Sequence, residues 1–373
     1  MNILTVGAGP AGLYFAYLAK RQRPDWHIRV VEQNRADSTF GFGVVFSDRA
    51  LEFLRDDDPA TYRLITPEME TWTDLVVVHR GTPVRIDGIG FAAIGRLRLL
   101  RLLRQQLESV SIVPEHGRAI DSSDELRGYD LVVGADGVNS FVRQSSGEAF
   151  GTTVDLLRNR FAWYGTTRRF ETLTQTFVET EHGTFNAHHY RHAPQMSTFV
   201  VECDPATWRR AGFAAMDEAA TLAYCERVFA GTLDGHRLLS NRSIWRSFPT
   251  VRNRRWWAGH VVLVGDALHT AHFSIGSGTR LAMEDAIALA RALREAAGDV
   301  PEALAAYETA RRPIVAKLLA AADASGAWYE GFPEHMRLAP RDLAWSYIQR
   351  SGRIDPARLR TIAPRFVEGR GAD

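Results

Sequence analysis

The order of apolar and polar residues at the start of the chain predicts a parallel βαβ unit. Asn2 to Val6 is a short apolar run typical of a buried strand, and the glycine-rich sequence GAGPAG follows it directly. Leu13 to Gln22 then has the pattern of a helix that ends before Pro24, and Ile28 to Glu32 is a second apolar run. Because a strand, a turn, a helix and a strand follow one another, we expect two parallel neighbouring strands.

Two further apolar strands are predicted farther along the chain. Asp130 to Val133 leads into GADGVNS, and His260 to Val264 leads into GDALHTAHFSIGSG. Each strand therefore ends in a glycine-containing loop, as the first strand does. A helix is expected from about Thr279 and an alanine-rich helix over 302–325, followed by short helices or coil to Asp373.

The middle of the chain has a different pattern. Between 158 and 249, short β-rich runs alternate with turn residues, which predicts a mostly antiparallel sheet. Arg98 to Leu107 is expected to be a basic amphipathic helix with leucines at a four-residue spacing, and the segment 38–48, rich in glycine and aromatic residues, is not expected to be helical. These patterns indicate one nucleotide-binding unit built from both ends of the chain, with a sheet inserted between them.

Composition and charge exclude several classes of protein. The 373 residues carry 45 basic and 44 acidic side chains, and a net charge of +1 gives no field that would attract nucleic acid or an anionic membrane. Cys203 and Cys225 are too few for a disulfide scaffold and indicate reduced thiols. There is no signal peptide pattern and no uncharged apolar stretch of roughly 20 residues. We therefore expect a cytoplasmic protein without a metal site, since the histidines lack metal-ligand spacing.

The first loop has the composition of a dinucleotide-binding turn. Gly7 permits the tight turn, Gly9 lets a pyrophosphate approach the backbone, and Gly12 lets helix and strand pack closely. Glu32 lies twenty residues after Gly12 at the end of the second strand, where its carboxylate can accept hydrogen bonds from a ribose. An acidic side chain here would repel a 2′-phosphate, so FAD or NAD is favoured over NADP.

Two further motifs bear on that choice. The sequence DLVVGADGVNSFVR contains Asp136 and Gly137, and GDALHTAHFSIGSGTRLAMEDA contains Asp266 and the loop Gly276 to Thr279. Asp266 offers a hydrogen-bond acceptor directly after a buried strand, although a helix cap is the alternative. The loop offers backbone N–H groups and a helix dipole to a negatively charged part of a ligand.

Together the three motifs resemble the signature of the para-hydroxybenzoate-hydroxylase-like flavoproteins, the group A FAD-dependent aromatic monooxygenases, over nearly the whole chain. The resemblance implies an α/β fold with a Rossmann-like FAD-binding domain of the GR2 type, an inserted mostly antiparallel β-sheet substrate domain and C-terminal helices. The expected boundaries are 1–75, 88–155 and 255–325 for FAD binding, 76–87 and 156–254 for the substrate, and 326–373 for the C-terminal helices. The residues expected to bind FAD are Gly7, Gly9, Pro10, Ala11, Gly12, Glu32, Gln33, Arg96, Asp136, Gly137, Asp266, Gly276, Ser277, Gly278 and Thr279.

Other stretches narrow the resemblance. TFGFGVVFSD, RNRFAWYGT, ETEHGTFNAHHY and AHFSIGSGTRLAMEDAIALARAL look like the hydroxylases of aromatic acyl-CoA thioesters, namely salicylyl-CoA 5-hydroxylase and the hydroxylase part of anthraniloyl-CoA monooxygenase. They look more distantly like the violacein-pathway monooxygenase. Family members commonly have proline after the GD segment, whereas this chain has Phe273 and Ser274. With no room for a second reductase-like domain before Asp373, hydroxylation without subsequent ring reduction is expected.

The resemblance also implies a mechanism. NADH or NADPH binds transiently and reduces FAD, O2 adds to give a C4a-hydroperoxyflavin, and the aromatic ring attacks its distal oxygen. A hydroxyl or amine on the ring must outweigh the withdrawing thioester, so salicylyl- or anthraniloyl-type substrates are expected. Water must be excluded from the site.

Candidate substrate and catalytic residues follow from side-chain chemistry. Aromatic and apolar side chains suit the ring, although most such residues lie in protein cores; the candidates are Val45, Phe46, Trp163, Trp245 and Phe273, with Phe42, Tyr164 and Phe248 as further aromatic ones. Groups that could take a phenol proton are His188, Tyr190, His269 and His272, unless they are hydrogen-bonded structural residues. Arginine clusters that could meet CoA phosphates, or be solvated surface, are Arg158/Arg160, Arg168/Arg169, Arg209/Arg210 and Arg252/Arg254/Arg255.

Three alternatives remain open from the sequence. A flavin monooxygenase could act on a free aromatic or indole-derived metabolite. The N-terminal glycine motif alone would also fit a NAD-dependent dehydrogenase, which would be colourless, or a non-catalytic nucleotide-binding module. Oligomeric state, monomer or homodimer, is not indicated.

Overall fold

A six-stranded sheet is built from segments at both ends of the chain. The computed structural model describes residues 1–47 and 51–369. The strand order is β16-β17-β9-β1-β2-β8, and all neighbours are parallel except β16 and β17. The strands are β1 (Asn2–Val6), β2 (His27–Glu32), β8 (Glu115–His116), β9 (Leu131–Gly134), β16 (Trp257–Ala258) and β17 (Val261–Leu263). Because β17 lies beside β9, residues near 262 complete a sheet that begins at residue 2.

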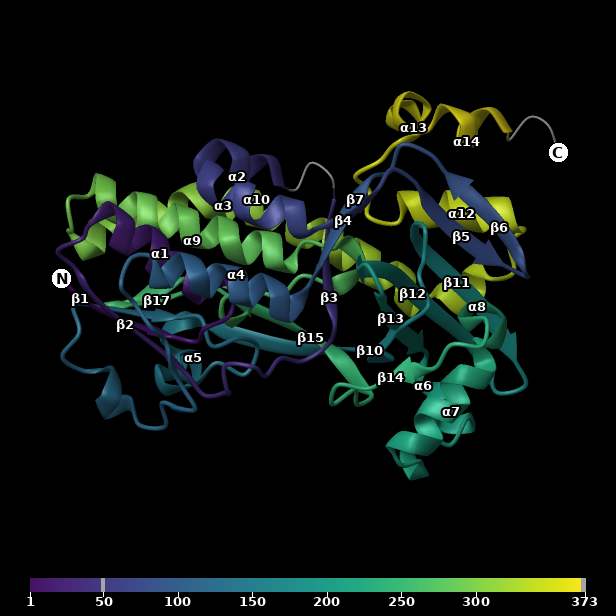
Figure 1. Ribbon diagram of the computed structural model, residues 1–373, viewed down its shortest axis with the longest axis horizontal. Helices are drawn as coiled ribbons and strands as arrows, with labels where there is room; N and C mark the ends of the chain where they lie inside the picture. The colour runs from purple at the N-terminus through teal and green to yellow at the C-terminus, as the bar shows by residue number, and fades with distance from the viewer. Residues whose placement is uncertain (48–50, 370–373) are drawn as a thin grey trace.

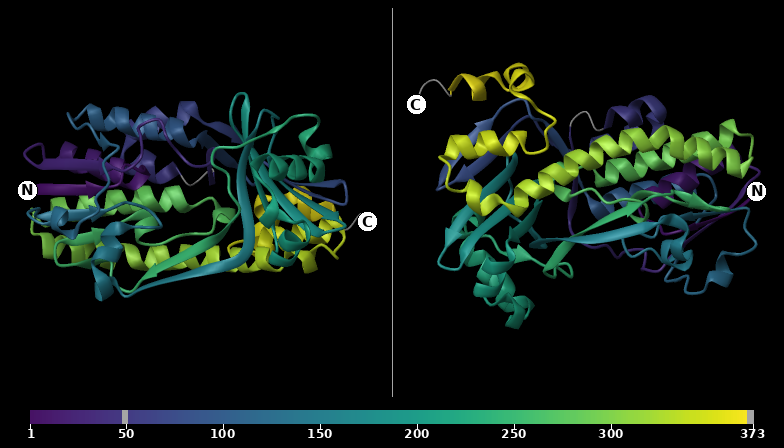
Figure 2. Two further views of the ribbon diagram at one scale, coloured as in Figure 1. Left: turned by 90° about the horizontal axis from the view of Figure 1, so that it is seen from below. Right: turned by 180° about the vertical axis from the view of Figure 1, so that it is seen from behind.

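Helices cover one face of this sheet and enclose the largest hydrophobic core. Figure 1 shows α1 (Pro10–Gln22), α9 (Gly278–Glu295) and α10 (Val300–Glu330) above the strands. Helix α4 (Arg96–Glu108) packs beside α1, and its Leu99, Leu103 and Leu107 are buried as their spacing predicts. Helix α10 continues past the sheet into the other half of the molecule (Figure 2).

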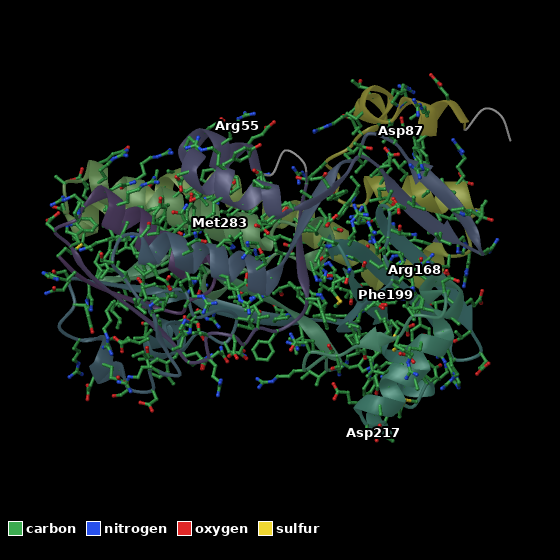
Figure 3. The ribbon with its side chains drawn as sticks, viewed as in Figure 1. Arg55, Asp87, Arg168, Phe199, Asp217 and Met283 are labelled. Atoms are coloured by element: carbon green, nitrogen blue, oxygen red, sulfur yellow. The ribbon has the colours of Figure 1, made fainter. Side chains whose placement is uncertain are left out.

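The other half is an eight-stranded, mostly antiparallel sheet. Its order is β14-β10-β13-β12-β11-β5-β6, with β15 also paired to β10, and β11 and β5 are parallel. The strands are β5 (Leu75–His79), β6 (Thr82–Ile86), β10 (Thr152–Thr166), β11 (Leu173–Thr180), β12 (Gly183–Ala193), β13 (Met196–Cys203), β14 (Leu238–Leu239) and β15 (Arg246–Asn253). Met283 and Phe199 mark the helix-covered half and the sheet half in Figure 3.

One long strand, β10, connects the two halves. Its first part pairs with β15 from Thr152 to Phe161, and its last part pairs with β13 from Arg160 to Thr166. The register with β15 shifts between Leu156 and Arg160. Side chains alternate along a strand, so Phe161 and Trp163 lie on one face of the sheet, and Ala162 and Tyr164 lie on the other.

Smaller elements close the molecule. A three-stranded sheet has the order β3 (Gly43–Ser47), β7 (Phe91–Gly95), β4 (Glu70–Trp72). The helices α2 (Glu52–Asp57) and α3 (Pro59–Ile65) lie between β3 and β4 in the chain. The C-terminal helices α11 (Phe332–His335), α12 (Pro340–Gln349), α13 (Pro356–Ile362) and α14 (Pro364–Glu368) follow α10, and a second hydrophobic core forms between them, β5 and β6. Helix α14, the last described element, lies far from β1 in the view of Figure 1.

The predicted fold class is confirmed: an α/β nucleotide-binding fold, a mostly antiparallel sheet and C-terminal helices. One expectation was incomplete, because the segment 158–249 also contains α6 (Pro205–Arg210), α7 (Glu218–Val228) and α8 (Ala230–Leu233). These helices cover the sheet face that carries Phe185 and Phe199. The exact domain boundaries stay a prediction, and the expectations for Asp48 and for 370–373 fall outside the described residues.

Candidate active site

A cavity of ≈ 1100 Å³ lies between the two halves and extends from the first glycine loop to the large sheet. Its wall is formed by the ends of β1, β2, β9 and β17, by β3, by the loop before α9, and by β10, β12 and β15. The predicted segments from both ends of the chain therefore meet around one space. Such a cavity is the natural place for a ligand.

The glycine loop leaves open backbone at the start of α1. Gly7 has a φ of +105°, and a Cβ there would lie 2.3 Å from the carbonyl oxygen of Ala135. A Cβ on Gly12 would lie 2.0 Å from the carbonyl oxygen of Gly7, whereas nothing lies within 4 Å of the corresponding position at Gly9. Backbone atoms pack closely at Gly7 and Gly12, whereas the space beside Gly9, in front of the helix N-terminus, is open. A pyrophosphate in that space would be stabilised by the helix dipole. Pro10, Ala11 and Gly12 form the first turn of α1 and do not line the cavity.

Glu32 is held in place at the end of β2 and lines the cavity. Its Oε2 accepts a hydrogen bond from the Ala8 backbone N–H at 2.8 Å. Its Oε1 accepts from the backbone N–H and the side-chain amide of Asn34, at 2.8 and 2.7 Å. Oε1 therefore has both lone pairs engaged, whereas Oε2 has a further lone pair for a ribose hydroxyl. Gln33, Asn34 and Arg118 line the same end of the cavity.

The loop after β9 contributes an unsatisfied carboxylate. Oδ2 of Asp136 accepts from the Val142 backbone N–H at 3.1 Å, but its Oδ1 is buried without a partner. Burial raises the pKa of this carboxyl. Gly137 follows with a φ of +79° and nothing within 4 Å of a Cβ position. A buried acceptor beside open backbone needs a donor from a ligand or water.

Arg143, in α5 (Phe141–Ser145), stabilises this corner of the cavity. Its guanidinium donates to the carbonyl oxygens of Ala267 and Val138 at 2.8 and 2.6 Å. The loop after β9 is thereby tied to the turn after β17, so the two motifs that are 130 residues apart in sequence act as one wall.

Asp266 and Arg96 are oppositely charged side chains that both line the cavity and interact electrostatically. Asp266 lies in a 3-10 turn, η6 (Gly265–Ala267), directly after β17, and it is enclosed by protein yet open to the cavity. Burial raises the pKa of Asp266, and the positive charge of Arg96 opposes that shift. Arg96 donates from Nε to Thr39 Oγ1 at 3.1 Å, and burial lowers its pKa. The carboxylate of Asp266 and the guanidinium of Arg96 therefore provide a hydrogen-bond acceptor and a donor for polar atoms of a ligand.

The loop before α9 brings its backbone to the cavity. Gly276 has a φ of +59°, and a Cβ there would lie 3.0 Å from Cγ1 of Val45. Gly276, Ser277, Gly278 and Thr279 all line the cavity, and α9 begins at Gly278. The N-terminus of an 18-residue helix therefore points at the space in front of Val45.

Aromatic side chains line the remaining part of the cavity. The Phe161 and Phe273 ring centroids are 4.9 Å apart, and His188 lies 5.7 Å from Phe273. The Tyr190 hydroxyl donates to the carbonyl oxygen of Gly43 at 2.9 Å, which ties β12 to β3. The Trp163 ring packs on Gly41, where a Cβ would lie 2.7 Å from Cδ2 of the indole. These side chains form an apolar pocket next to the Gly276 loop, which we call the aromatic pocket.

His188 is a buried ionisable group of the aromatic pocket. It is buried, and its Nδ1 has no hydrogen-bond partner. Burial lowers the pKa of His188 to about 3, and the charge of Arg350 adds to the effect. The imidazole is therefore neutral at physiological pH: it can donate and accept a hydrogen bond but carries no positive charge.

Four candidates lie away from the cavity. His269 Nε2 lies 2.9 Å from Asp285 Oδ2, in a buried network with Arg311. His272 Nδ1 is 2.7 Å from Ser274 Oγ, and Ser274 is bonded in turn to Ser325. Phe46 is in the core beneath the parallel sheet helices, and Trp245 packs 4.6 Å from Phe213 on the opposite side of the large sheet. Because none of the four lines the cavity, we exclude them from the set proposed to touch substrate.

Sequence reasoning missed several cavity residues. Phe161 is two residues from Trp163 on the same face of β10, so strand alternation could have found it. Arg118, Arg242 and Arg246 also line the cavity, but nothing in their spacing marks them. None of the four arginine clusters named from the sequence lines it.

The residues present fit FAD. Open backbone at Gly9, an acceptor at Glu32, a buried acceptor without a partner at Asp136 and the polar pair Asp266 and Arg96 all line one cavity. These groups suit the pyrophosphate, ribose and ribityl parts of a flavin dinucleotide. Within residues 1–47 and 51–369, no cluster of three or more His, Cys, Asp or Glu could hold a metal ion. No helix in these ranges has the length and apolar character needed to cross a membrane.

Comparison with known proteins shows to which family the chain belongs. The model of the FAD binding domain family matches residues 117–322, more than half of the chain. The chain is also 42% identical to salicyloyl-CoA 5-hydroxylase from a Streptomyces species, over 94% of this chain and 70% of the relative. This protein belongs to the FAD-dependent aromatic monooxygenases. The cofactor of this monooxygenase is therefore FAD, and NADH or NADPH is the reductant typical of its class.

Other relatives of this FAD-dependent monooxygenase act on different aromatic compounds. It is 40% identical to 3-hydroxy-4-methyl-anthranilyl-[aryl-carrier protein] 5-monooxygenase from Streptosporangium sibiricum over the full length of both chains. It is 36% identical to protodeoxyviolaceinate monooxygenase from Chromobacterium violaceum, over 95% of this chain and 96% of that one. A crystal structure of 2-methyl-3-hydroxypyridine-5-carboxylic acid oxygenase shares the fold with a TM-score of 0.71 at 19% identity, covering 97% and 96% of the two chains.

Proposed function

We propose that this monooxygenase hydroxylates the ring of an aromatic acyl thioester of the salicylyl-CoA type. The observation that carries the proposal is the aromatic pocket, which adjoins the Gly276 loop in a cavity that is also open to solvent. A small ring can lie against Phe161 and Phe273 while a long acyl carrier extends outward. The similarity to a salicyloyl-CoA hydroxylase and to a monooxygenase of a carrier-bound anthranilyl group supports a thioester.

The reaction consumes the aromatic thioester, O2, NAD(P)H and a proton, and yields the hydroxylated thioester, NAD(P)+ and water. Bound FAD supplies the redox chemistry, by which one oxygen atom of O2 becomes electrophilic toward the ring. A ring hydroxyl or amine directs the new hydroxyl group to the para position. The acyl thioester withdraws electrons, so a donor group on the substrate is required.

The protein's own groups have separate tasks in this reaction. We propose that Glu32, Asp136, Arg96 and Asp266 hold polar atoms of the cofactor. The backbone N–H groups from Gly276 to Thr279 stabilise negative charge near the ring of the flavin. Phe161, Trp163, Phe273 and Val45 exclude water and hold the substrate ring. The neutral imidazole of His188 orients the donor group of the substrate by a hydrogen bond, and Tyr190 fixes β3 behind it.

Holoenzyme and a panel of substrates test the proposal. Substrate-stimulated NAD(P)H oxidation and product mass are measured with salicylyl-CoA, anthraniloyl-CoA, benzoyl-CoA and the corresponding free acids. We expect the mass of one oxygen atom to be added to salicylyl-CoA or anthraniloyl-CoA, and little product from benzoyl-CoA, which has no donor group. If free salicylate were hydroxylated as well as its thioester, the thioester proposal would be wrong, and a free aromatic or indole-derived substrate, as the violacein relative suggests, would replace it.

A further inference from the structure

The opening of the cavity carries exposed apolar side chains. Of the eight large apolar side chains that are exposed in the described residues, Phe40, Val154 and Leu156 line the cavity, with exposed fractions of 44%, 52% and 67%. Two more, Leu239 and Ile244, lie in or beside the connection between β14 and β15. Concentrated exposed apolar surface at the opening of a cavity indicates a binding surface.

Two arginines stand at the same opening without anionic partners. Arg242 and Arg246 line the cavity, and no hydrogen bond or ion pair of either side chain is found within the described part of the chain. The other cavity arginines are engaged: Arg96 with Thr39, Arg118 with Glu125, and Arg143 with two carbonyl groups. The opening therefore holds two positive charges that are available to a ligand.

Among the described residues, no carboxylate compensates the charge of Arg246. Partial burial lowers the pKa of Arg246, and no acidic side chain opposes that shift. Among the described residues, the acidic ones that line the cavity are Glu32, Asp136, Glu148 and Asp266. All four belong to segments around the part of the cavity that suits FAD. Arg246 is instead paired across β10 and β15 with Phe161, at the edge of the aromatic pocket.

The segment that carries these arginines is fixed to the pocket wall. The side-chain amide of Asn241 donates to the carbonyl oxygens of Thr39 and Gly41, both at 2.9 Å. Ser243 Oγ donates to the carbonyl oxygen of Trp163. Arg242 lies over the ring of Phe40, with Cζ 5.9 Å from the ring centroid. These contacts fix the segment next to the aromatic pocket, so less conformational entropy is lost when a ligand binds the two arginines.

We propose that Arg242 and Arg246 bind the phosphate of a phosphopantetheine arm, whose chain leads from the opening of the cavity into the aromatic pocket. This inference rests on the proposed thioester substrate and names the feature that recognises its carrier. Guanidinium groups match phosphate oxygens in geometry and charge, and the methylene and amide groups of pantetheine suit a partly apolar path. CoA and the prosthetic group of a carrier protein share this arm.

A series of salicylyl thioesters tests the phosphate contact. The acyl group is carried by pantetheine, by 4′-phosphopantetheine, by CoA and by an aryl-carrier protein. Holoenzyme variants R242Q, R246Q and the double variant are compared with R209Q, which replaces an exposed arginine of α6 outside the cavity. Flavin absorbance and thermal unfolding confirm that each variant is folded and loaded.

We expect the double variant to raise KM about 10-fold or more for phosphopantetheine and CoA thioesters, because a charged hydrogen-bonded contact is lost. The KM for the pantetheine thioester, which has no phosphate, and the kcat for all substrates should stay unchanged, as should every value in R209Q. The carrier with the lower KM in the wild type, CoA or protein, identifies the natural source of the arm, and its KM must rise in the double variant.

Two results would overturn the inference while leaving the thioester substrate intact. One is an equal rise in KM for thioesters with and without phosphate, and the other is no rise for either. If the double variant does not fold, the single variants are measured in the same way. In addition, free phosphopantetheine should inhibit wild-type turnover more strongly than free pantetheine, and equal inhibition by the two would overturn the inference. Failure of the proposed function has a different signature: the wild type hydroxylates none of the thioesters.

Discussion

Arg350 donates from Nη2 to the carbonyl oxygen of Ser274 at 2.8 Å. The donor follows α12 near the C-terminus, and the acceptor lies in the 3-10 turn η7 (Phe273–Ile275), directly before the Gly276 loop. A second bond joins Arg350 Nη1 to the carbonyl oxygen of Tyr347 at 2.8 Å, and the guanidinium stacks 3.8 Å from the Tyr347 ring. The C-terminal helices therefore hold in place the turn that carries Phe273.

Replacing Arg350 by methionine should loosen this turn. Loss of two charge-assisted hydrogen bonds is expected to lower the free energy of unfolding by about 1–3 kcal/mol. Because Phe273 shields the aromatic pocket from water, the fraction of NAD(P)H that yields hydroxylated product should also fall several-fold, with hydrogen peroxide formed instead. Arg337→Met, at an exposed arginine paired with Glu334, is the control and should change neither quantity. Unchanged coupling in Arg350→Met would show that the turn does not depend on α12.

Substituting Gly41 should displace the Trp163 wall of the pocket. A Cβ at Gly41 would lie 2.7 Å from the indole, and the φ of +74° adds strain for any side chain. Gly41→Ala is expected to raise KM for the aromatic substrate several-fold while FAD remains bound, as steady-state kinetics and flavin absorbance would measure. Gly81→Ala is a matched control, because its φ of +73° is the same but nothing lies within 4 Å. A rise in KM of equal size in both variants would contradict the role of Trp163.

Buried histidines should make stability fall in weak acid. Burial lowers the pKa of His189 to about 3, below its unfolded value of 6.5, so the unfolded state binds more protons between these values. The contribution of His189 is present above pH 6.5 and is lost as the pH falls toward 3. Relative to His189→Gln, the wild type should lose about 2 kcal/mol of unfolding free energy between pH 8 and pH 5. Urea unfolding at a series of pH values measures this difference, and parallel curves for the two proteins would contradict it.

Glu202 should have the opposite dependence. Burial raises its pKa to about 8, with Glu330 adding to the shift and the hydrogen bond from Asn159 at 2.8 Å opposing it. Its favourable contribution is fully present below the unfolded pKa of 4.5 and is lost as the pH rises toward 8. Glu202→Gln should therefore gain about 3 kcal/mol on the wild type between pH 5 and pH 8. Glu295→Gln, at an exposed acid, should show no such gain in the same unfolding experiment.

The nucleotide-binding part of the site could be predicted because local rules govern it. Gly7 and Gly12 are required where backbone atoms approach within a few ångströms, and Glu32 ends a strand whose position follows from the same unit. The mouth of the cavity could not be predicted. It forms where residues 39–41 meet Asn241 and its neighbours, some 200 positions later in the chain, and single arginines in a connection have no periodic signal.

The histidines show a different limit of sequence reasoning. His269 and His272 are close in sequence to the Gly276 loop, but in a chain of tight turns neighbouring side chains point in different directions. His269 points toward Asp285 of α9, and His272 points toward Ser274 and Ser325. His188, on a regular strand, is directed by alternation toward the cavity.

The position of β17 beside β9 has a consequence for synthesis of the protein. As the chain leaves the ribosome, β1, β2 and β9 emerge early, but the strand that covers the free edge of β9 and the helix α9 that covers α1 emerge more than 120 residues later. Until then, the nascent chain exposes an unpaired edge and an apolar helix face, both of which invite aggregation. The sheet and its helix cover can therefore be completed only after residues 261–295 have left the ribosome.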